Sequence, residues 1–224
     1  MFPENHAVLV VGEPNAGMFE FCSYLGSTYL TNGESLVFVE TNTSPVNIRK
    51  QMALFGVNAA EYEASGMFVI VDCYTPPKSS MVDPVVLRAS SSSALSEVAE
   101  KINEGINKVG GPPVRVLIDS LTPLFMEHEA KEVAMFFKTV SSLIKESGAM
   151  TCVLHRGLLD EDQISVLSSL ADGLLEIRMD EEFRRFVRIK FVRGLQVTPR
   201  WVPFDFEMEQ EAREEGAMLS WKRE

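Results

Sequence analysis

The chain has 224 residues, of which 46% are hydrophobic and 24% charged, which is enough for one large domain, 1–224, with a substantial core. The net charge is −11 and the 21 Lys and Arg residues form no run, so we expect neither nucleic acid nor an anionic membrane surface as a partner. The three cysteines are scattered, which suits a reducing compartment, and no apolar run is long enough to span a membrane. We therefore expect a cytoplasmic protein.

The first expected strand runs into a turn that opens a helix, over residues 7–19. Gly12 and Gly17 have the spacing of the phosphate loop G-x-x-x-x-G-K-[S/T], in which backbone N–H groups and the lysine hold phosphates and the hydroxyl holds Mg²⁺. Met18 stands at the lysine position and Phe19 at the hydroxyl position. The frame of the motif is thus present without its two chemical residues. On this stretch alone, a turn with two useful glycines is the alternative.

The loop carries two further signs that phosphate is no longer its ligand. Glu13 places a negative charge inside it, which disfavours a triphosphate by roughly 1 kcal/mol or more at ~4 Å. Met18 and Phe19 would expose apolar area in an open cleft, and burying a large side chain is favourable by ~1.5–3 kcal/mol. We therefore expect one or both to turn inward and fill the vacated phosphate volume.

Strands and helices are then expected to alternate along the chain. Mainly apolar runs indicate buried strands at 35–39, 68–71, 114–120 and 150–154. Helical spacing covers 19–30, 45–55, 95–109, 129–147 and 160–170. A further apolar run at 173–178 is followed by alternating apolar and basic residues at 185–192, the second typical of a half-exposed antiparallel strand, whereas 76–93 is expected to be a long surface loop and 207–215 a solvated acidic edge. The pattern predicts an α/β fold with a mainly parallel sheet flanked by helices and an antiparallel C-terminal edge.

Polar residues follow several of the expected strands: Asn42, Thr43, Asp72, Asp119 and His155. In a parallel sheet the carboxyl ends of the strands share one edge, which is where ligands bind. Asp119 after the apolar residues Val116, Leu117 and Ile118 matches the carboxylate that holds Mg²⁺ beside a phosphate loop, and equally a strand-end Asp that caps the next turn. Its combination with Gly12 and Gly17 favours descent from a nucleotide-binding ancestor.

Several motifs in order resemble the KaiC-like branch of the RecA superfamily over nearly the whole chain. They are the second strand and its turn at 32–45, F-G at 55–56, G-x-x-x-I-x-D at 66–72, I-D-S-L-T at 118–122 after Leu117, A-D-G at 171–173, R-G at 193–194 and W-x-P-F at 201–204. The resemblance implies a RecA-like fold, an oligomer and, in the family, ATP hydrolysis.

The departures from the family pattern fall on its chemistry. The family's paired catalytic glutamates correspond to Asn42 and Thr43, neither of which is a base near neutral pH. Glu40 lies about 6–7 Å from Asn42, back along the expected strand, which is too far for it to replace the missing catalytic base. The K-x-R-G element, whose cations approach a neighbour's nucleotide in the family, keeps only Arg193, with Lys190 displaced to the opposite face.

The resemblance and its departures together imply a pseudo-ATPase that acts as a regulatory or assembly subunit, bound to itself, to another protein or to an active KaiC-like ATPase. We expect no catalytic residue, no metal site and no cofactor, with ATP and Mg²⁺ bound weakly if at all. The vestigial nucleotide site is expected to comprise Gly12, Asn15, Ala16, Gly17, Met18, Phe19 and Asp119. One alternative is a nucleotide or anion held, without hydrolysis, by the N–H groups of 15–19. Another is an enzyme site rebuilt from Asp72, Asp119 and His155, which lacks a nucleophile–base pair at readable spacing.

Overall fold

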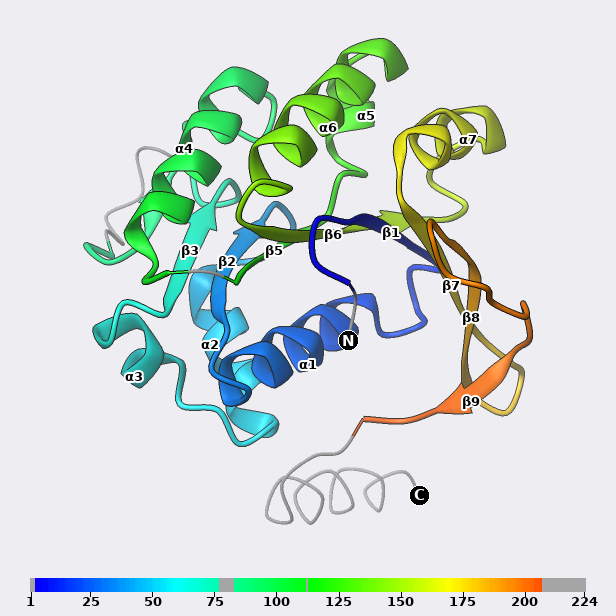
Figure 1. Cartoon of the computed structure of the whole chain (residues 1–224), viewed down its shortest axis with the longest axis horizontal. Helices are drawn as coiled ribbons and strands as arrows, with labels where there is room; N and C mark the ends of the chain where they lie inside the picture. Colours follow the sequence, from blue (N-terminus) through cyan, green and yellow to red (C-terminus); the bar gives the residue numbers. More distant parts are fainter. Residues whose placement is uncertain (1–2, 77–82, 112, 207–224) are drawn as a thin grey trace, which may run out of the picture.

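The computed structural model describes residues 3–76, 83–111 and 113–206, and within them one sheet of nine strands runs in the order β4-β3-β2-β5-β6-β1-β7-β8-β9 (Figure 1). The strands are β1 (Ala7–Gly12), β2 (Ser35–Glu40), β3 (Phe68–Asp72), β4 (Leu87–Arg88), β5 (Val114–Asp119), β6 (Gly148–His155), β7 (Gly173–Met179), β8 (Arg185–Val192) and β9 (Val202–Phe204). The helices are α1 (Met18–Thr31), α2 (Pro45–Leu54), α3 (Ala59–Ala64), α4 (Leu95–Lys108), α5 (Leu124–Glu127), α6 (Ala130–Ile144) and α7 (Glu161–Leu170).

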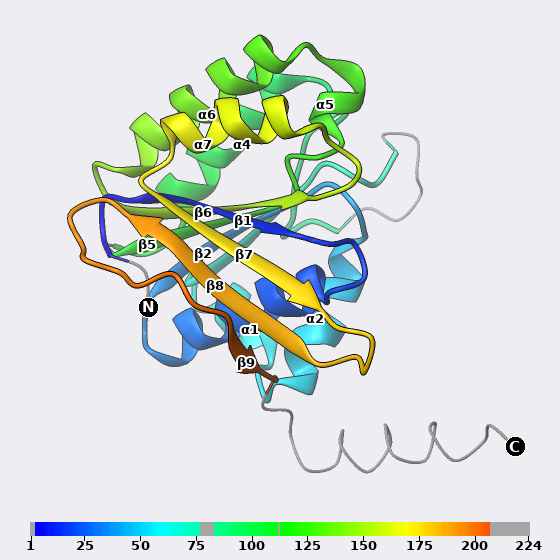
Figure 2. The ribbon, with the colours of Figure 1, turned by 90° about the vertical axis from the view of Figure 1, so that its right-hand side faces the viewer.

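The centre of the sheet is parallel because its strands are apolar on both faces. Every residue of β1, β2, β3 and β5 is buried, and these strands pair in parallel with their neighbours. Helices α4, α6 and α7 cover one face and α1, α2 and α3 cover the other (Figures 1 and 2). Each face has its own apolar core, one packed with Phe137 and Ile102 and the other with Tyr29 and Met52.

The last two strands pair in antiparallel fashion. β7 runs parallel to β1, whereas β8 pairs antiparallel with β7 and β9 pairs antiparallel with β8. Figure 2 shows β7, β8 and β9 forming one end of the sheet. The predicted fold, a mainly parallel sheet with an antiparallel C-terminal edge, is confirmed.

The expected loop at 76–93 is wrong in part, because it contains β4. Leu87 is buried and pairs with Val71 of β3, which adds a short edge strand. The helix expected at 129–147 begins at Ala130 and ends at Ile144, with Glu129 and Glu132 forming a capping box at its start. The acidic segment at 207–215 lies outside the described residues. No helix in the described ranges is long and apolar enough to cross a membrane.

Candidate functional site

The loop between β1 and α1 keeps the backbone shape of a phosphate-binding turn. Gly17 is left-handed, with φ 79° and ψ 42°, and no side chain caps the N-terminus of α1, which begins at Met18. The Ala16 N–H donates to the Glu13 carbonyl over 3.0 Å, closing the turn. Because a left-handed conformation strains a residue with a side chain, glycine is required at 17.

Met18 turns inward, as expected for at least one of the two replaced residues. It is 1% exposed and belongs to the core that includes Val10 and Cys22. A Cβ atom at Gly12 would overlap the Met18 sulfur, so glycine at 12 makes room for this side chain. A cleft of about 440 Å³ nevertheless persists at the loop, so Met18 does not fill the vacated space.

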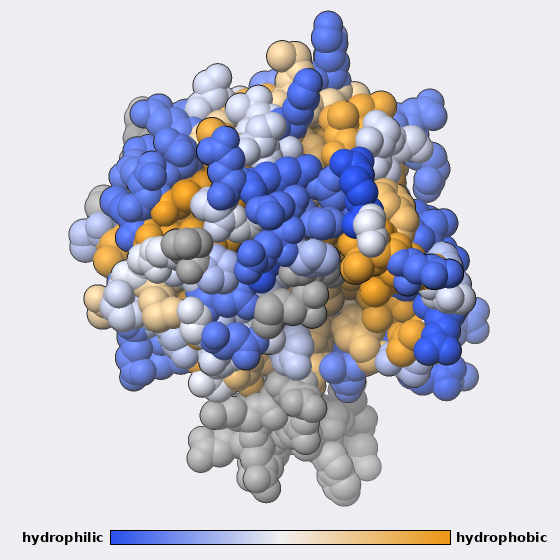
Figure 3. Space-filling model, in the orientation of Figure 1, coloured by the Kyte–Doolittle hydropathy of each residue, from blue (hydrophilic) through white to orange (hydrophobic). Residues whose placement is uncertain are grey.

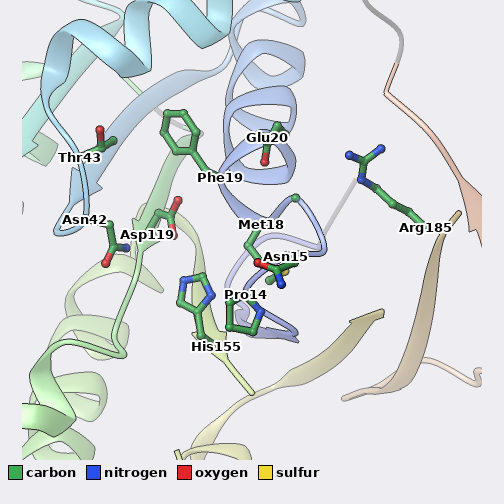
Figure 4. A pocket seen from close by; sticks show the side chains of 11 residues that line it. Pro14, Asn15, Met18, Phe19, Glu20, Asn42, Thr43, Asp119, His155 and Arg185 are labelled. Carbon is green, nitrogen blue, oxygen red and sulfur yellow. The ribbon is translucent and has the colours of Figure 1, made fainter. Parts of the chain in front are cut away.

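The cleft lies at the carboxyl edge of the sheet, where the sequence predicts a site (Figure 4). Its lining comes from the loop and α1, the segment after β2, the ends of β5 and β6 and the start of β8: Pro14, Asn15, Gly17, Met18, Phe19, Glu20, Asn42, Thr43, Asp119, His155 and Arg185. Five of the seven predicted site residues are therefore together. The other two, Gly12 and Ala16, are packed beneath the loop and do not line the cleft.

Asp72 does not join this cleft. Its Oδ1 accepts hydrogen bonds from the N–H groups of Tyr74 and Thr75, and it lines a separate groove with Arg88. The enzyme site imagined from Asp72, Asp119 and His155 is consequently not assembled. In the described residues, no group of three or more His, Cys, Asp or Glu could hold a metal ion.

Asp119 is the buried carboxylate of the cleft. It is 2% exposed, and its Oδ1 has no hydrogen-bond partner among the described residues. Burial, with the negative charge of Glu20 as a smaller cause, raises the pKa of Asp119 to about 7. This carboxyl group is therefore poised between its neutral and charged forms near neutral pH.

Glu40 pairs in register with Asp119 and does not line the cleft. Its Oε1 accepts from the N–H groups of Asn42 (2.6 Å) and Thr43 (3.0 Å), while Oε2 has no partner in the described part of the chain. Burial, and then the nearby Asp119 charge, raise the pKa of Glu40 well above its usual range. Glu40 thus orders the turn after β2.

His155 is the last residue of β6 and lies at the same carboxyl edge of the sheet. Its backbone N–H donates to the Thr122 hydroxyl over 2.9 Å, whereas its Nδ1 has no partner among the residues described. Burial lowers the pKa of His155, so the ring is neutral near pH 7. A neutral imidazole at this place can accept or donate a single hydrogen bond.

Arg185, like Glu20, lines the cleft and was not predicted from the sequence. It begins β8, and the antiparallel pairing of β8 with β7 returns it to the carboxyl edge, opposite Met179. Its Nε lies 2.9 Å from the place that a Cβ atom at Gly17 would occupy, and its Nη1 is 3.3 Å from Asp205 Oδ1. The loop therefore has a cation beside it, although the lysine of the motif is absent. The alternation of apolar and basic residues at 185–192 was the feature of the sequence that could have indicated a cation here.

Arg193 lies at the opposite edge of the sheet from the cleft. It follows Val192, which pairs with Gly173 at the start of β7, and its Nη1 is 2.6 Å from Asp172 Oδ1. Lys145 and the N–H of Ala7 also bond to Asp172. In this chain Arg193 joins the end of β8 to Asp172 at the amino edge of the sheet. It does not line the cleft.

A family model described as "ATPase: KaiC" matches residues 1–210. The chain belongs to the KaiC ATPase family. It is 28% identical over 210 residues to a UPF0273 protein of Methanopyrus kandleri, covering 91% of this chain and 81% of that protein. A UPF0273 protein of Aeropyrum pernix is also 28% identical over 211 residues, covering 91% and 83%. The family resemblance of the ordered motifs is thereby confirmed.

The fold has a counterpart among solved structures. The KaiC-like protein PH0186 of Pyrococcus horikoshii superposes with a TM-score of 0.70, covering 92% of this chain and 88% of that one. Its sequence identity is 20%, so the likeness concerns the fold. It agrees with the RecA-like arrangement expected for the nine-stranded sheet.

Proposed function

We propose that this KaiC-family protein does not hydrolyse ATP and acts as a regulatory or assembly subunit through contacts with protein partners. The observation that carries the proposal is Met18, which stands at the lysine position of the phosphate loop and is buried against Gly12. A buried thioether supplies neither a positive charge nor a hydrogen-bond donor to a phosphate.

The residues of the cleft do not fit a magnesium nucleotide. Phe19 replaces the hydroxyl that would hold Mg²⁺, and the metal prefers oxygen ligands. Asn42 and Thr43 line the place where a base would activate water, and neither ionises near neutral pH. Arg185 leaves one cation at the loop; its Nη1 is 3.3 Å from the exposed Asp205 Oδ1, and its buried Nε has no partner among the described residues.

Exposed apolar side chains support a role in protein contacts. Met126 is 81% exposed and Phe183 is 77% exposed, the latter with a positive φ in the turn between β7 and β8. Figure 3 shows hydrophobic residues reaching the surface between charged ones on one face of the molecule. Exposed apolar area of this kind is typical of interaction surfaces when it gathers into patches. A second copy of the chain and an active KaiC-like ATPase are the two partners we propose.

The experiment is the mass of the purified protein by light scattering, alone, with MgATP, and with an active family member. We expect a mass that is indifferent to MgATP and a complex with itself or with the relative. An oligomer that forms only with MgATP would contradict the proposal, because it would show that the cleft still holds nucleotide. The matched control is Asp119→Asn, which should leave the mass unchanged.

A further inference from the structure

Three side chains of the cleft lining carry a buried polar atom with no hydrogen-bond partner among the described residues: Asp119 and His155 on one side, and Arg185, through its Nε, on the other side of the start of α1 (Figure 4). Asp119 lines it with a buried Oδ1 that has no partner among the described residues, and the neighbouring His155 has a buried Nδ1 in the same condition. An ionised carboxylate removed from water without a partner is costly. A donor bound in the cleft would remove that cost.

The charges that face the cleft are negative on balance. Asp119 and Glu20 line it and His155 is neutral, while Glu40, beside Asp119 in the adjacent strand, has its pKa raised to about 9 by burial and the Asp119 charge and is neutral near pH 7. Arg185 is the one cation in the lining, and in the described residues its ion pair is with Asp205 rather than with Asp119 or Glu20. Figure 4 shows Arg185 on the far side of the start of α1 from Asp119. The Asp119 side of the cleft therefore has no counter-charge.

Phe19 adds an aromatic surface on that same side. It replaces the metal-holding hydroxyl, lines the cleft, and extends toward the side where Asp119 and Thr43 lie (Figure 4). Asn42 donates its Nδ2 to the Ser120 hydroxyl over 3.2 Å, which leaves its amide oxygen as an acceptor. A carboxylate, an amide oxygen and an aromatic ring are the groups with which proteins bind organic cations.

We propose that the cleft binds an organic cation, a guanidinium or alkylammonium group, with Asp119 as its counter-ion, Phe19 as its aromatic face and Asn42 and His155 as further acceptors. The cleft volume of about 440 Å³ accommodates such a head group with an alkyl stem. The inference rests on the proposed loss of nucleotide chemistry, because it assigns a new ligand to the emptied site. The cation has two sources, an Arg or Lys side chain of a partner protein and a free small molecule.

The test uses two probes, agmatine as the free cation and a glycine-flanked peptide with a single arginine as the side chain, titrated into the isotope-labelled full chain and followed by NMR. We expect saturable shifts at Asp119 and Phe19 with a Kd of about 1 mM or tighter for agmatine. Asp119→Asn should weaken binding at least about tenfold and Phe19→Leu about threefold. The control Glu13→Gln removes a nearby carboxylate outside the cleft lining and should leave the affinity unchanged. Binding of both probes assigns the site to a side chain, and binding of agmatine alone assigns it to a free cation.

A second readout does not depend on any variant folding. Because the bound carboxylate must be ionised, agmatine affinity of the unmodified chain should rise from about pH 6 to about pH 8. The proposal is overturned if agmatine gives no saturable shift, if Asp119→Asn and Phe19→Leu both bind as tightly as the unmodified chain, or if inorganic phosphate takes the site instead. Absence of agmatine binding with no ATP turnover would overturn this inference alone, whereas ATP turnover would overturn the proposed function.

Discussion

Two buried aspartates at opposite edges of the sheet differ in how their charge is satisfied. Asp172, at the amino edge, is 4% exposed and bonds to Lys145, to Arg193 and to the N–H of Ala7. Asp119, at the carboxyl edge, is 2% exposed and has an oxygen with no partner among the described residues. The first arrangement stabilises the fold by tying three segments together. The second arrangement lowers stability, because it leaves a buried oxygen without a hydrogen bond at the carboxyl edge, where ligands bind in this fold.

The pKa values of the two aspartates are shifted in opposite directions. Bonds to Lys145 and Ala7 and the charge of Arg193 outweigh partial burial and lower the pKa of Asp172, whereas burial raises that of Asp119. A satisfied carboxylate therefore favours the folded state when ionised, and an unsatisfied one favours it when protonated. The motifs that contain them, A-D-G and I-D-S-L-T, do not reveal this difference.

The largest effect is expected for Asp172→Ala. It leaves Lys145 and Arg193 without their carboxylate and the Ala7 N–H without its acceptor. We expect the free energy of unfolding to fall by about 3 kcal/mol. This is below the upper range for buried pairs because both cations are partly exposed. Urea denaturation measures it. Asp119→Asn is the matched control, and it should be neutral or stabilising by about 1 kcal/mol. Equal losses for the two variants would break the comparison.

A somewhat smaller loss is expected when the motif residues are restored. Met18→Lys with Phe19→Thr places an ammonium group where Met18 is buried against Gly12, so we expect destabilisation by roughly 2 kcal/mol or more. Denaturation and MgATP affinity are measured on the same variant. Unchanged stability with restored MgATP affinity would mean that the lysine reaches the cleft, and the burial of Met18 would then be incidental.

The pH dependence of stability should have opposite signs for the two edges. The pKa of Asp119 is raised to about 7 in the folded state. Between about pH 4 and pH 7, Asp119 has therefore lost its proton in the unfolded chain but keeps it in the folded chain. The contribution of Asp119 to stability consequently falls as pH rises. The slope is up to about 1.4 kcal/mol per pH unit. Asp119→Asn should remove this fall.

Asp172 contributes in the other direction. Its pKa is lowered in the folded state, so the stability that it supplies is present above the pKa of the unfolded chain and is lost as pH falls through that of the folded one. Denaturation curves from acid to neutral pH, for the unmodified chain and for each single variant, separate the two. A steeper fall with rising pH in Asp119→Asn would reverse the assignment.

The smallest effect is expected from the nucleotide itself. Because stabilisation by a ligand scales as RT ln(1 + [L]/Kd) and we expect a Kd at or above about 1 mM, millimolar MgATP should raise the Tm by about 1 °C or less. Thermal denaturation with ATP alone, Mg²⁺ alone and both measures it. A rise of several degrees that requires Mg²⁺ would show a working nucleotide site at the carboxyl edge.

Much of this architecture could be predicted from the sequence, because long apolar runs and regular spacing report burial directly. The elements missed are short, such as β4, α3 and α5, whose few residues hold too little of a period to recognise. The cleft residues of the loop were predicted from the spacing of Gly12 and Gly17, and Asn42, Thr43, Asp119 and His155 from their places at the ends of strands, which the carboxyl edge of the sheet brings together.

The missed cation could not be predicted from spacing. Arg185 lies more than 160 residues after Gly17, and only the register of β8 with β7 places it beside the loop. The different fates of Met18 and Phe19 were equally hidden, since adjacent residues at the start of a helix point about 100° apart and tertiary packing decides which one is buried. Met18 is buried in the core, whereas Phe19 is only partly buried and lines the cleft.

The most direct test of the account is phosphate release from ATP by the purified chain, compared with that by Asp119→Ala prepared in the same way. The cleft has no base at Asn42 or Thr43 and no lysine at Met18, so both proteins should release phosphate at the same background rate. Turnover by the unmodified chain that Asp119→Ala abolishes would contradict the account, because it would show that the buried carboxylate still serves nucleotide chemistry.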